Sequence, residues 1–499
     1  MKKRVLFSIT ALLLDVLVFG QSLENVLNAE NMKPASSSFL IKNADDGKIV
    51  LQHRAEKAAT PASLAKIITT ATALEILGGD FRFETCLEYD GKLDKNGILN
   101  GNLYIRGGGD PTLGSQFIDN ADFLPEWIEA VKKTGIKIIK GNVIADASLC
   151  SDEGISPKWN WEDIGNHYAT GVYALNVNDN SCTVTLKSGR VGTTAEIVKV
   201  QPSIPGLSLL SQVKASSISY DSAYAYGAPL LNERIIRGAI PARRSEFPIR
   251  IDMPNPPLYL AQLVTNSLVE NGIKINGKAE CSFQKNVNPK RLIYSHYSAP
   301  LSEIVKEINH RSINLYAECV LLRLAVHEKG QGDAVSGISI IKNFWKSKNI
   351  DVSPLFLYDG SGLSSSNAVP AEFLVDVLQY MYAKSANKDI FIASLPVAGE
   401  SGTVKNLLKG TALEGKVCAK SGTIGGVQSY AGYIVWKDKT YAFALIVNHF
   451  SGKRKEIIKH LESVLLSITD LTPDPFPQGE GSNEATDANS TGEGEALNF

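Results

Sequence analysis

Ser63-Leu64-Ala65-Lys66 opens an apolar run that predicts a buried helix. Apolar residues recur at steps of three and four through this run: Leu64, Ile67, Ile68, Ala71, Leu74 and Leu77. Pro61 suits a helix start, and Gly78-Gly79 suits a helix end. Ser63 is therefore expected at the helix N-terminus, with Lys66 one turn further on the same face. Free N–H groups there favour a developing anion, and a lysine held among apolar neighbours loses proton affinity.

Two later segments supply further polar groups in an order that is typical of an acyl-transfer site without histidine. Ser312-Ile313-Asn314 interrupts a helical pattern that runs from Leu301 to Leu324, and a tight turn is expected at that point. Lys420-Ser421-Gly422-Thr423 is expected on an edge strand beside a hairpin whose turn is Lys437-Asp438-Lys439. Gly422 would let a ligand approach the backbone closely.

Each of the three pieces is common by itself. Ser385-Ala386-Asn387-Lys388 also matches the first two patterns, and Lys187-Ser188-Gly189 matches the third. Taken singly, Ser63 with Lys66 fits an exposed face of an amphipathic helix, and Ser312-Ile313-Asn314 fits a polar helix surface. The order and the local context of the three pieces favour a single site.

The chain resembles the serine D-alanyl-D-alanine carboxypeptidase/endopeptidases of the low-molecular-mass penicillin-binding class, the bacterial dacB-type family with a large insertion. The similarity extends from about Ser36 to about Leu466, and beyond the three motifs it rests on four segments: Gly101–Leu113, Ala174–Asn180, Ser312–Glu318 and Asp359–Ser364. Ile313 stands where this family has Asp, and Ser421 stands where it has Thr. The motifs nevertheless keep the hydroxyl, amide and ammonium groups that the chemistry uses.

The resemblance implies a serine D,D-peptidase that cleaves D-Ala-D-Ala termini or D,D cross-links of peptidoglycan stem peptides through an acyl-enzyme on Ser63. It implies that Lys66 is the base for Ser63 and that Ser312 passes a proton to the leaving amine. The backbone N–H groups of Ser63 and Thr423 would form the oxyanion hole. The residues that would bind the substrate are Asn314, Lys420, Ser421 and Thr423. No cofactor is implied, and β-lactam antibiotics would act as inhibitors by acylating Ser63.

Two other functions remain open at this point. A serine β-lactamase shares the nucleophile, but no Glu-x-x-Leu-Asn-like loop is present to support deacylation, and a long middle region would be left unexplained. A catalytically idle cell-wall binding protein is the second alternative. The intact Ser63, Lys66 and Lys420 argue against it.

The expected fold class is α+β and multidomain, with a discontinuous penicillin-binding/β-lactamase-like α/β peptidase domain and a large β-rich insertion. A chain of 499 residues exceeds one ordinary core. Asp46-Gly47 predicts a hairpin that we place with the Ser63 helix in the peptidase domain. The peptidase domain is expected to comprise residues 21–80 and 291–470. Residues 81–290, in which Gly-containing turns separate short strands, are expected to form one or two inserted modules.

Both ends of the chain are expected to lie outside the folded domains. The basic residues 2–4 precede an apolar run from Val5 to Phe19, which predicts a signal peptide over residues 1–20 and export to the periplasm or cell envelope of a bacterium. An uncleaved membrane anchor is the alternative. Residues 471–499 are rich in Pro, Gly, Glu, Ser and Thr, which is typical of a disordered tail.

The composition argues against several other classes of protein. The formal net charge is −1 and no basic block is present, so nucleic acid is not an expected partner. The seven histidines show no metal-ligand spacing. The six cysteines contain no Cys-x-x-Cys pair and are expected to be buried small hydrophobes, with disulfides left open. Peripheral membrane association and the oligomeric state are left open as well.

Overall fold

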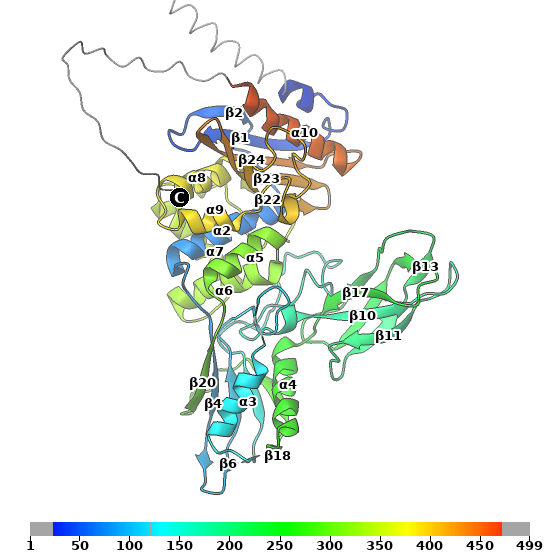
Figure 1. The fold of residues 1–499 in the computed structure, drawn as a ribbon, viewed down its shortest axis with the longest axis vertical. Helices are drawn as coiled ribbons and strands as arrows, with labels where there is room; N and C mark the ends of the chain where they lie inside the picture. The colour runs from blue at the N-terminus through cyan, green and yellow to red at the C-terminus, as the bar shows by residue number, and fades with distance from the viewer. Residues whose placement is uncertain (1–22, 120–121, 472–499) are drawn as a thin grey trace, which may run out of the picture.

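The computed structural model describes residues 23–119 and 122–471. The signal peptide expected at residues 1–20 lies outside the described residues, as does the expected tail apart from residue 471. The molecule is elongated: one large sheet with its helices lies at one end, two smaller sheets lie at the other, and a group of short strands projects sideways from the middle (Figure 1). Within the described ranges, no helix has the length and apolar character needed to cross a membrane.

The sheet of the peptidase domain is antiparallel and has the strand order β2-β1-β24-β23-β22. Its members are β1 (Ser36–Asn43), β2 (Ile49–His53), β22 (Val417–Ile424), β23 (Val427–Trp436) and β24 (Lys439–Asn448). Strands from the two ends of the sequence therefore pair in one sheet, as β24 does with β1 along the whole length of β1. Both predicted hairpins are present, and β22 is an edge strand as predicted.

Both faces of this sheet are buried, which explains why its strands are nearly continuous apolar runs. Successive side chains of a strand point to opposite faces. In β24, Phe443 and Leu445 pack with Leu461 of α10 (Arg454–Leu466) on one face. Ala442 and Ala444 face the other side, where small side chains let helix α8 (Ala371–Ala383) approach closely.

Helix α2 (Ala65–Leu77) lies at the centre of the helical layer, and ten of its residues are buried. It packs most extensively against α5 (Leu301–Arg311), α6 (Asn314–Lys329), α7 (Ala334–Ser347) and α8. The short α9 (Lys388–Ser394) completes the layer. The buried residues of α2 include Lys66 and three threonines as well as apolar side chains, so the helix is interior on nearly all sides. The predicted α2 is confirmed, and it ends at Gly78 as expected.

The far end of the molecule holds two small sheets. One has the order β19-β9-β7-β4-β20 and comprises β4 (Glu84–Tyr89), β7 (Leu103–Arg106), β9 (Val143–Asp146), β19 (Ala279–Ser282) and β20 (Arg291–Tyr297). The other has the order β18-β8-β6-β5 and comprises β5 (Lys92–Leu93), β6 (Ile98–Asn100), β8 (Ile138–Ile139) and β18 (Lys274–Ile275). Helices α3 (Leu124–Lys133) and α4 (Pro256–Glu270) lie beside them (Figure 1).

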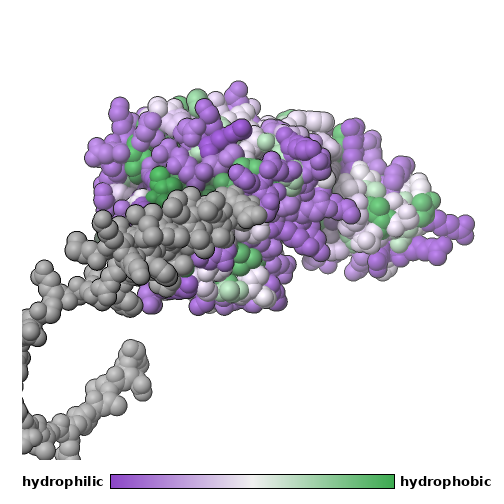
Figure 2. All heavy atoms as spheres, turned by 90° about the horizontal axis from the view of Figure 1, so that it is seen from above, coloured by the Kyte–Doolittle hydropathy of each residue, from purple (hydrophilic) through white to green (hydrophobic). Residues whose placement is uncertain are grey.

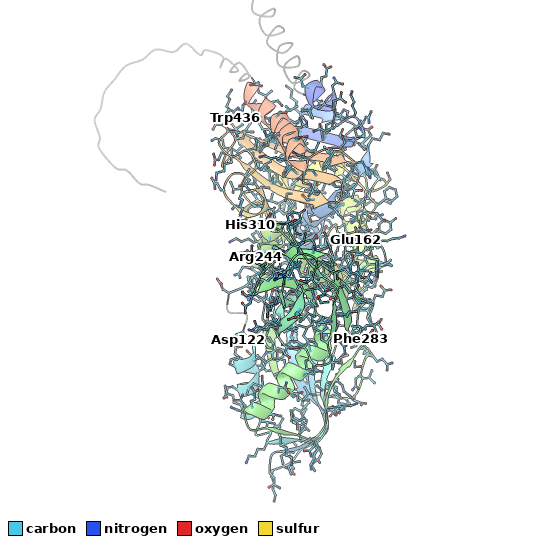
Figure 3. All side chains as sticks on the ribbon, turned by 90° about the vertical axis from the view of Figure 1, so that its right-hand side faces the viewer. Asp122, Glu162, Arg244, Phe283, His310 and Trp436 are labelled. Carbon is cyan, nitrogen blue, oxygen red and sulfur yellow. The ribbon has the colours of Figure 1, made fainter. Side chains whose placement is uncertain are left out.

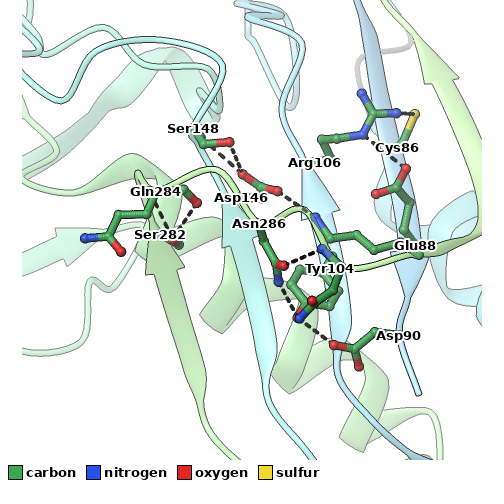
Figure 4. A network of polar contacts seen from close by, with 12 residues as sticks. Cys86, Glu88, Asp90, Tyr104, Arg106, Asp146, Ser148, Ser282, Gln284 and Asn286 are labelled. Carbon is green, nitrogen blue, oxygen red and sulfur yellow. Dashed lines mark hydrogen bonds and ion pairs between the residues drawn. The ribbon is translucent and has the colours of Figure 1, made fainter. Parts of the chain in front are cut away.

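The five-stranded sheet has one apolar and one polar face. Leu103 and Ile105 of β7 point toward a core that includes Trp127 of α3. On the opposite face, Arg106 binds Glu88 at 3.1 Å, and Tyr104 belongs to a network of polar side chains (Figure 4). This alternation is the usual pattern of a sheet that is covered on one side only.

Strand β20 pairs with β4 through Tyr297, so the sheet of the middle region continues beyond residue 290. The expected division of the chain into domains at residue 290 stays a prediction, but the strand pairing places residues 291–297 with the middle region. Helices α3 and α4 were not foreseen in a region expected to be β-rich.

We call residues 181–252 the side module, which projects from the middle of the molecule (Figure 1). It comprises a sheet β11-β10-β17, a sheet β12-β15-β14 and a pair β13-β16. Their bounds are β10 (Ser181–Lys187), β11 (Glu196–Gln201), β12 (Ser208–Ser211), β13 (Lys214–Ser216), β14 (Tyr224–Tyr226), β15 (Glu233–Arg237), β16 (Ala239–Pro241) and β17 (Phe247–Asp252). The buried Arg234 binds both carboxylate oxygens of Asp252, at 2.6 and 2.8 Å, and joins β15 to β17.

Candidate active site

Ser63 lies in a short 3-10 turn, η1 (Ala62–Leu64), that leads directly into α2. Ala62 has a φ of 49°, in the left-handed region that L-residues seldom adopt. The turn leaves Ser63 partly exposed, whereas Lys66 in the first turn of α2 is completely buried. The Lys66 ammonium lies 3.1 Å from the Ser63 hydroxyl oxygen. The structure thus brings together the two residues that the sequence paired.

Lys66 is surrounded by hydrogen-bond acceptors. Besides Ser63 Oγ, its Nζ contacts Asn314 Oδ1 and the Ser361 carbonyl oxygen, each at 2.6 Å. Burial lowers the pKa of Lys66 to about 7, although the charges of Asp359 and Glu318 act in the opposite direction. A lysine with this pKa is neutral in a large fraction of molecules near pH 7, so it can accept the proton of a serine hydroxyl.

Ser312 and Asn314 occupy the break between α5 and α6, as the sequence predicted. Ser312 has a φ of 63°, and this left-handed conformation ends α5 so that α6 can begin at Asn314. Both polar atoms of the Asn314 amide have partners. Its Oδ1 accepts from Lys66, and its Nδ2 donates to the Tyr168 carbonyl at 2.7 Å. These two partners fix the orientation of the amide.

Lys420 approaches from the edge strand β22 and is also completely buried. Its Nζ donates to Ser312 Oγ at 3.0 Å and to the Ser421 carbonyl at 2.7 Å. Burial, together with the charge of Lys66, holds the pKa of Lys420 well below its usual range. The four groups therefore form two serine–lysine pairs in one desolvated site.

Gly422 allows β22 to lie directly against the turn that carries Ser63. A Cβ at this position would be 2.5 Å from the Pro61 carbonyl oxygen and 3.2 Å from the Ser63 nitrogen. The Ser429 hydroxyl donates to the same Pro61 carbonyl at 2.8 Å. The backbone of β22 thus lies in close contact with the turn that carries the Ser63 N–H.

The hydroxyl groups of the last two predicted site residues have protein partners. Thr423 is exposed and contacts Gln428 Oε1 at 3.2 Å. Ser421 donates to Thr403 Oγ1 at 2.7 Å. Thr423 lines the cavity described next, whereas Ser421 is not among its lining residues.

A cavity of about 690 Å³ contains Ser63, Ser312, Asn314 and Thr423 in its wall. The wall continues into the side module, which contributes Tyr224 and Tyr226. The charged groups that line the cavity are Glu162, Asp163 and Arg454. Figure 3 shows Glu162 at the level where the peptidase helices meet the inserted modules. A second cavity, of about 710 Å³ beside α5, has none of the predicted site residues in its wall.

The sequence analysis missed the carboxylates behind Lys66. Glu318 accepts from the backbone N–H groups of Gly360 and Ser361, and this holds the Ser361 carbonyl against Lys66. Asp359 accepts from four donors: Gly362 N, Ser364 N, Asn367 Nδ2 and Trp159 Nε1. Glu318 and Asp359 lie in two of the segments on which the family resemblance rests, Ser312–Glu318 and Asp359–Ser364. The resemblance therefore pointed to both residues, but neither was given a role.

The two other motif matches lie outside the site. The Ser385 hydroxyl donates to Glu75, and Asn387 Nδ2 donates to the Leu74 carbonyl near the end of α2. Lys187-Ser188-Gly189 lies at the end of β10 in the side module. All six cysteines are free, and four of them are buried. The three motif pieces favoured by order and local context are thus the ones that the structure brings together, and their catalytic roles stay a prediction.

The sequence comparisons agree on the family. The model of the D-Ala-D-Ala carboxypeptidase 3 (S13) family matches residues 19–466. D-alanyl-D-alanine carboxypeptidase DacB of Haemophilus influenzae is 27% identical over 437 residues, covering 86% of this chain and 88% of that protein. D-alanyl-D-alanine carboxypeptidase of Actinomadura sp. strain R39 is 26% identical over 480 residues, covering 92% of this chain and 86% of that protein.

The fold agrees as well. The crystal structure of penicillin-binding protein 4 (dacB) from Haemophilus influenzae superposes with a TM-score of 0.79 at 24% identity, covering 90% of this chain and 99% of the other. The predicted α+β multidomain fold is confirmed. The chain belongs to the D-Ala-D-Ala carboxypeptidase 3 (S13) family and is a serine-type D,D-peptidase.

Proposed function

We propose that Ser63 is the nucleophile of this peptidase and that Lys66 is its base. The 3.1 Å contact between Lys66 Nζ and Ser63 Oγ, with Lys66 completely buried, is the observation that carries the proposal. Lys66 takes the hydroxyl proton while Ser63 Oγ attacks the carbonyl before the terminal residue. The backbone N–H groups of Ser63 and Thr423 stabilise the oxyanion.

The remaining groups complete the cycle. Ser312, in contact with Lys420, passes a proton to the leaving amine as the peptide C–N bond breaks. Asn314 binds the amide on the acyl side, and Lys420, Ser421 and Thr423 bind the terminal carboxylate. Lys66 then passes the proton that it took from Ser63 to the Ser312 oxygen, which restores the neutral amine and the Ser312 hydroxyl. Water attacks the ester of Ser63, and Lys66 takes a proton from that water. The acyl peptide leaves with a new carboxylate, and Ser63 regains its proton.

The substrate that we propose is a peptidoglycan stem peptide or cross-link with a D,D-amide. A β-lactam presents a strained amide of the same kind and would acylate Ser63. Support comes from the structure of penicillin-binding protein 4 of Haemophilus influenzae in complex with a β-lactam, which superposes with a TM-score of 0.73 at 22% identity. The family assignment favours a peptidase over the β-lactamase and the idle cell-wall binder that the sequence had left open.

A fluorescent penicillin tests the nucleophile. We expect wild-type protein to form a covalent adduct whose peptide contains Ser63, and Ser63→Ala to form none while it keeps its melting temperature. Ser385→Ala is the matched control, because Ser385 belongs to the second Ser-x-x-Lys match and should label normally. An adduct that persists in Ser63→Ala would assign the nucleophile to another serine. An acyl-enzyme that turns over within seconds would favour the β-lactamase.

We also propose that the protein is exported. The basic residues 2–4 and the apolar run up to Phe19 support this, and cleavage is expected after residue 20. Mass spectrometry of the mature N-terminus in a bacterial envelope fraction tests it. Recovery of the intact N-terminus in the membrane fraction would support the anchor instead.

A further inference from the structure

The catalytic cavity extends past the catalytic groups onto a set of exposed aromatic side chains. Tyr224 and Tyr226 of β14 form part of its wall. The ring of Trp161 stacks on that of Tyr226, with centroids 4.8 Å apart and planes inclined at 34°. Trp161 is 64% exposed and Tyr224 is 44% exposed. Exposed aromatic groups that gather beside a cleft indicate a binding surface. We call these three residues the aromatic shelf.

The shelf is held rigidly. Asn166, which is buried, accepts from the Ala225 backbone N–H at 3.0 Å and donates to the carbonyls of Glu162 and Asp163. Gly165 packs so closely against β14 that a Cβ there would be 2.6 Å from the Ala225 carbonyl oxygen. The loop that carries Trp161 and the strand that carries the two tyrosines therefore form one unit, and little ordering entropy is lost when a ligand binds.

The shelf lies on the acyl side of the site. Tyr168, in the same loop, accepts from the Asn314 amide at 2.7 Å, and Asn314 is the residue that we propose binds the acyl-side amide. Thr423 and Arg454 are contributed by β22 and α10, elements of the peptidase domain. A stem peptide whose scissile bond lies at Ser63 would thus extend from Asn314 toward the aromatic shelf.

The chemistry around the shelf is mixed rather than purely apolar. The Arg237 guanidinium lies 6.0 Å from the centre of the Tyr226 ring, and Glu162 borders the cavity. Figure 2 likewise shows hydrophobic and hydrophilic groups interspersed on the side module. Flat aromatic faces next to charged donors and acceptors suit a sugar ring, which has an apolar C–H face and a rim of hydroxyl and amide groups. A lipid or an apolar helix would require a continuous apolar surface.

We propose that Trp161, Tyr224 and Tyr226 form a saccharide subsite that holds the amino sugar to which the stem peptide is attached. The proposal rests on the proposed function, because a stem peptide is joined to the glycan through the end that lies away from the scissile bond. The enzyme would then prefer stems that are still attached to sugar over free stem peptides.

Paired substrates test the subsite. The kcat/KM for a free pentapeptide stem is compared with that for the same stem linked to its N-acetylated disaccharide. In Trp161→Ala and Tyr226→Ala we expect the ratio of kcat/KM for the sugar-linked stem over that for the free stem to fall about tenfold, equivalent to about 1.4 kcal/mol. Tyr220→Ala is the control, because Tyr220 is 66% exposed on the same module but is not among the residues lining the cavity.

Penicillin labelling of each variant separates the two proposals. Normal labelling shows that the variant is folded and that Ser63 is active. In such a variant, an equal loss of kcat/KM on both substrates, or no loss on either, would overturn the saccharide subsite alone. Absence of labelling in wild type would instead overturn the proposed function. Trp161→Tyr should keep the wild-type preference for the sugar-linked stem, whereas Trp161→Leu should lose it as Trp161→Ala does. This result would support stacking of an aromatic face on the sugar.

Discussion

Lys66 and Lys420 are both completely buried, and the charge of Lys66 adds to the effect of burial in lowering the pKa of Lys420. Each contacts a different serine, Lys66 at 3.1 Å from Ser63 and Lys420 at 3.0 Å from Ser312. Two ammonium ions in one desolvated site repel each other, so their protonation is coupled. In the free site, the neutral form of at least one of the two lysines is therefore favoured. A substrate carboxylate bound at Lys420 would favour the ammonium form of Lys420.

Acylation should become faster as the pH rises through about 7. Lys66 acts as a base only when it is neutral, and the neutral form predominates above its pKa of about 7. The second-order rate constant for penicillin acylation, measured from about pH 5 to pH 9, should increase and then level off. A rate that falls over this range would contradict the role of Lys66 as base.

Glu318→Gln should move this pH profile to lower pH. The Glu318 carboxylate raises the pKa of Lys66, so its removal should lower that pKa and shift the midpoint of the profile downward. The backbone donors of Gly360 and Ser361 would also lose a charged acceptor, at a cost of about 1–3 kcal/mol in the free energy of unfolding. Glu328→Gln, an exposed site on the same helix, is the control. If Glu318→Gln lowers the free energy of unfolding but leaves the midpoint of the pH profile unchanged, then Glu318 has a structural role only.

Gly422→Ala should slow acylation on the order of 10²-fold, as loss of an oxyanion-hole donor does. The added Cβ would press on the Pro61 carbonyl and on the backbone of Ser63, so the turn with the nucleophile would have to move. Gly425→Ala is the matched control, because a Cβ there meets no atom within 4 Å. Rapid-quench acylation rates for both variants provide the measurement. Equal rates would show that Gly422 does not set the position of Ser63.

Elements with a strong local pattern were predictable from the sequence. The periodicity that begins at Leu64 predicted α2, and the Asp46-Gly47 turn predicted the β1–β2 hairpin. The left-handed Ser312 also lies where a break in the helical pattern from Leu301 to Leu324 was predicted. In these segments short-range spacing and turn chemistry agree with the tertiary fold.

Other features depend on contacts that no local pattern reveals. Glu318 reaches the Gly360 backbone across 42 positions, and Asn314 reaches Tyr168 across 146. Helix α4 did carry a signal, since Asn255 caps it ahead of Pro256. The many Gly-containing turns around it led to the expectation of a β-rich region. The aromatic shelf could not be predicted either, because Trp161 and Tyr226 meet only after the side module folds.

Lys420→Ala should impair substrates with a free C-terminal carboxylate more than their C-terminal amides. We propose Lys420 as the charge partner of that carboxylate, and such a partner is strong in a desolvated cleft. Burial keeps its pKa low in the free site, but an incoming carboxylate raises that pKa and so favours the ammonium form. Loss of the group should cost on the order of 2–4 kcal/mol of transition-state binding for the acid, and less for the amide, which lacks the charge.

Because Lys420 also contacts Ser312, some loss of kcat/KM on both substrates is expected. The measurement is therefore the ratio of kcat/KM for acid over amide, compared between wild type and Lys420→Ala. Lys416→Ala, at an exposed position just before β22, should keep the wild-type ratio. Proton uptake on binding of the acid, measured by calorimetry in two buffers of different ionisation enthalpy, should disappear in Lys420→Ala. If the ratio stays unchanged in Lys420→Ala, then Lys420 acts in proton transfer through Ser312, and the carboxylate is held by other groups.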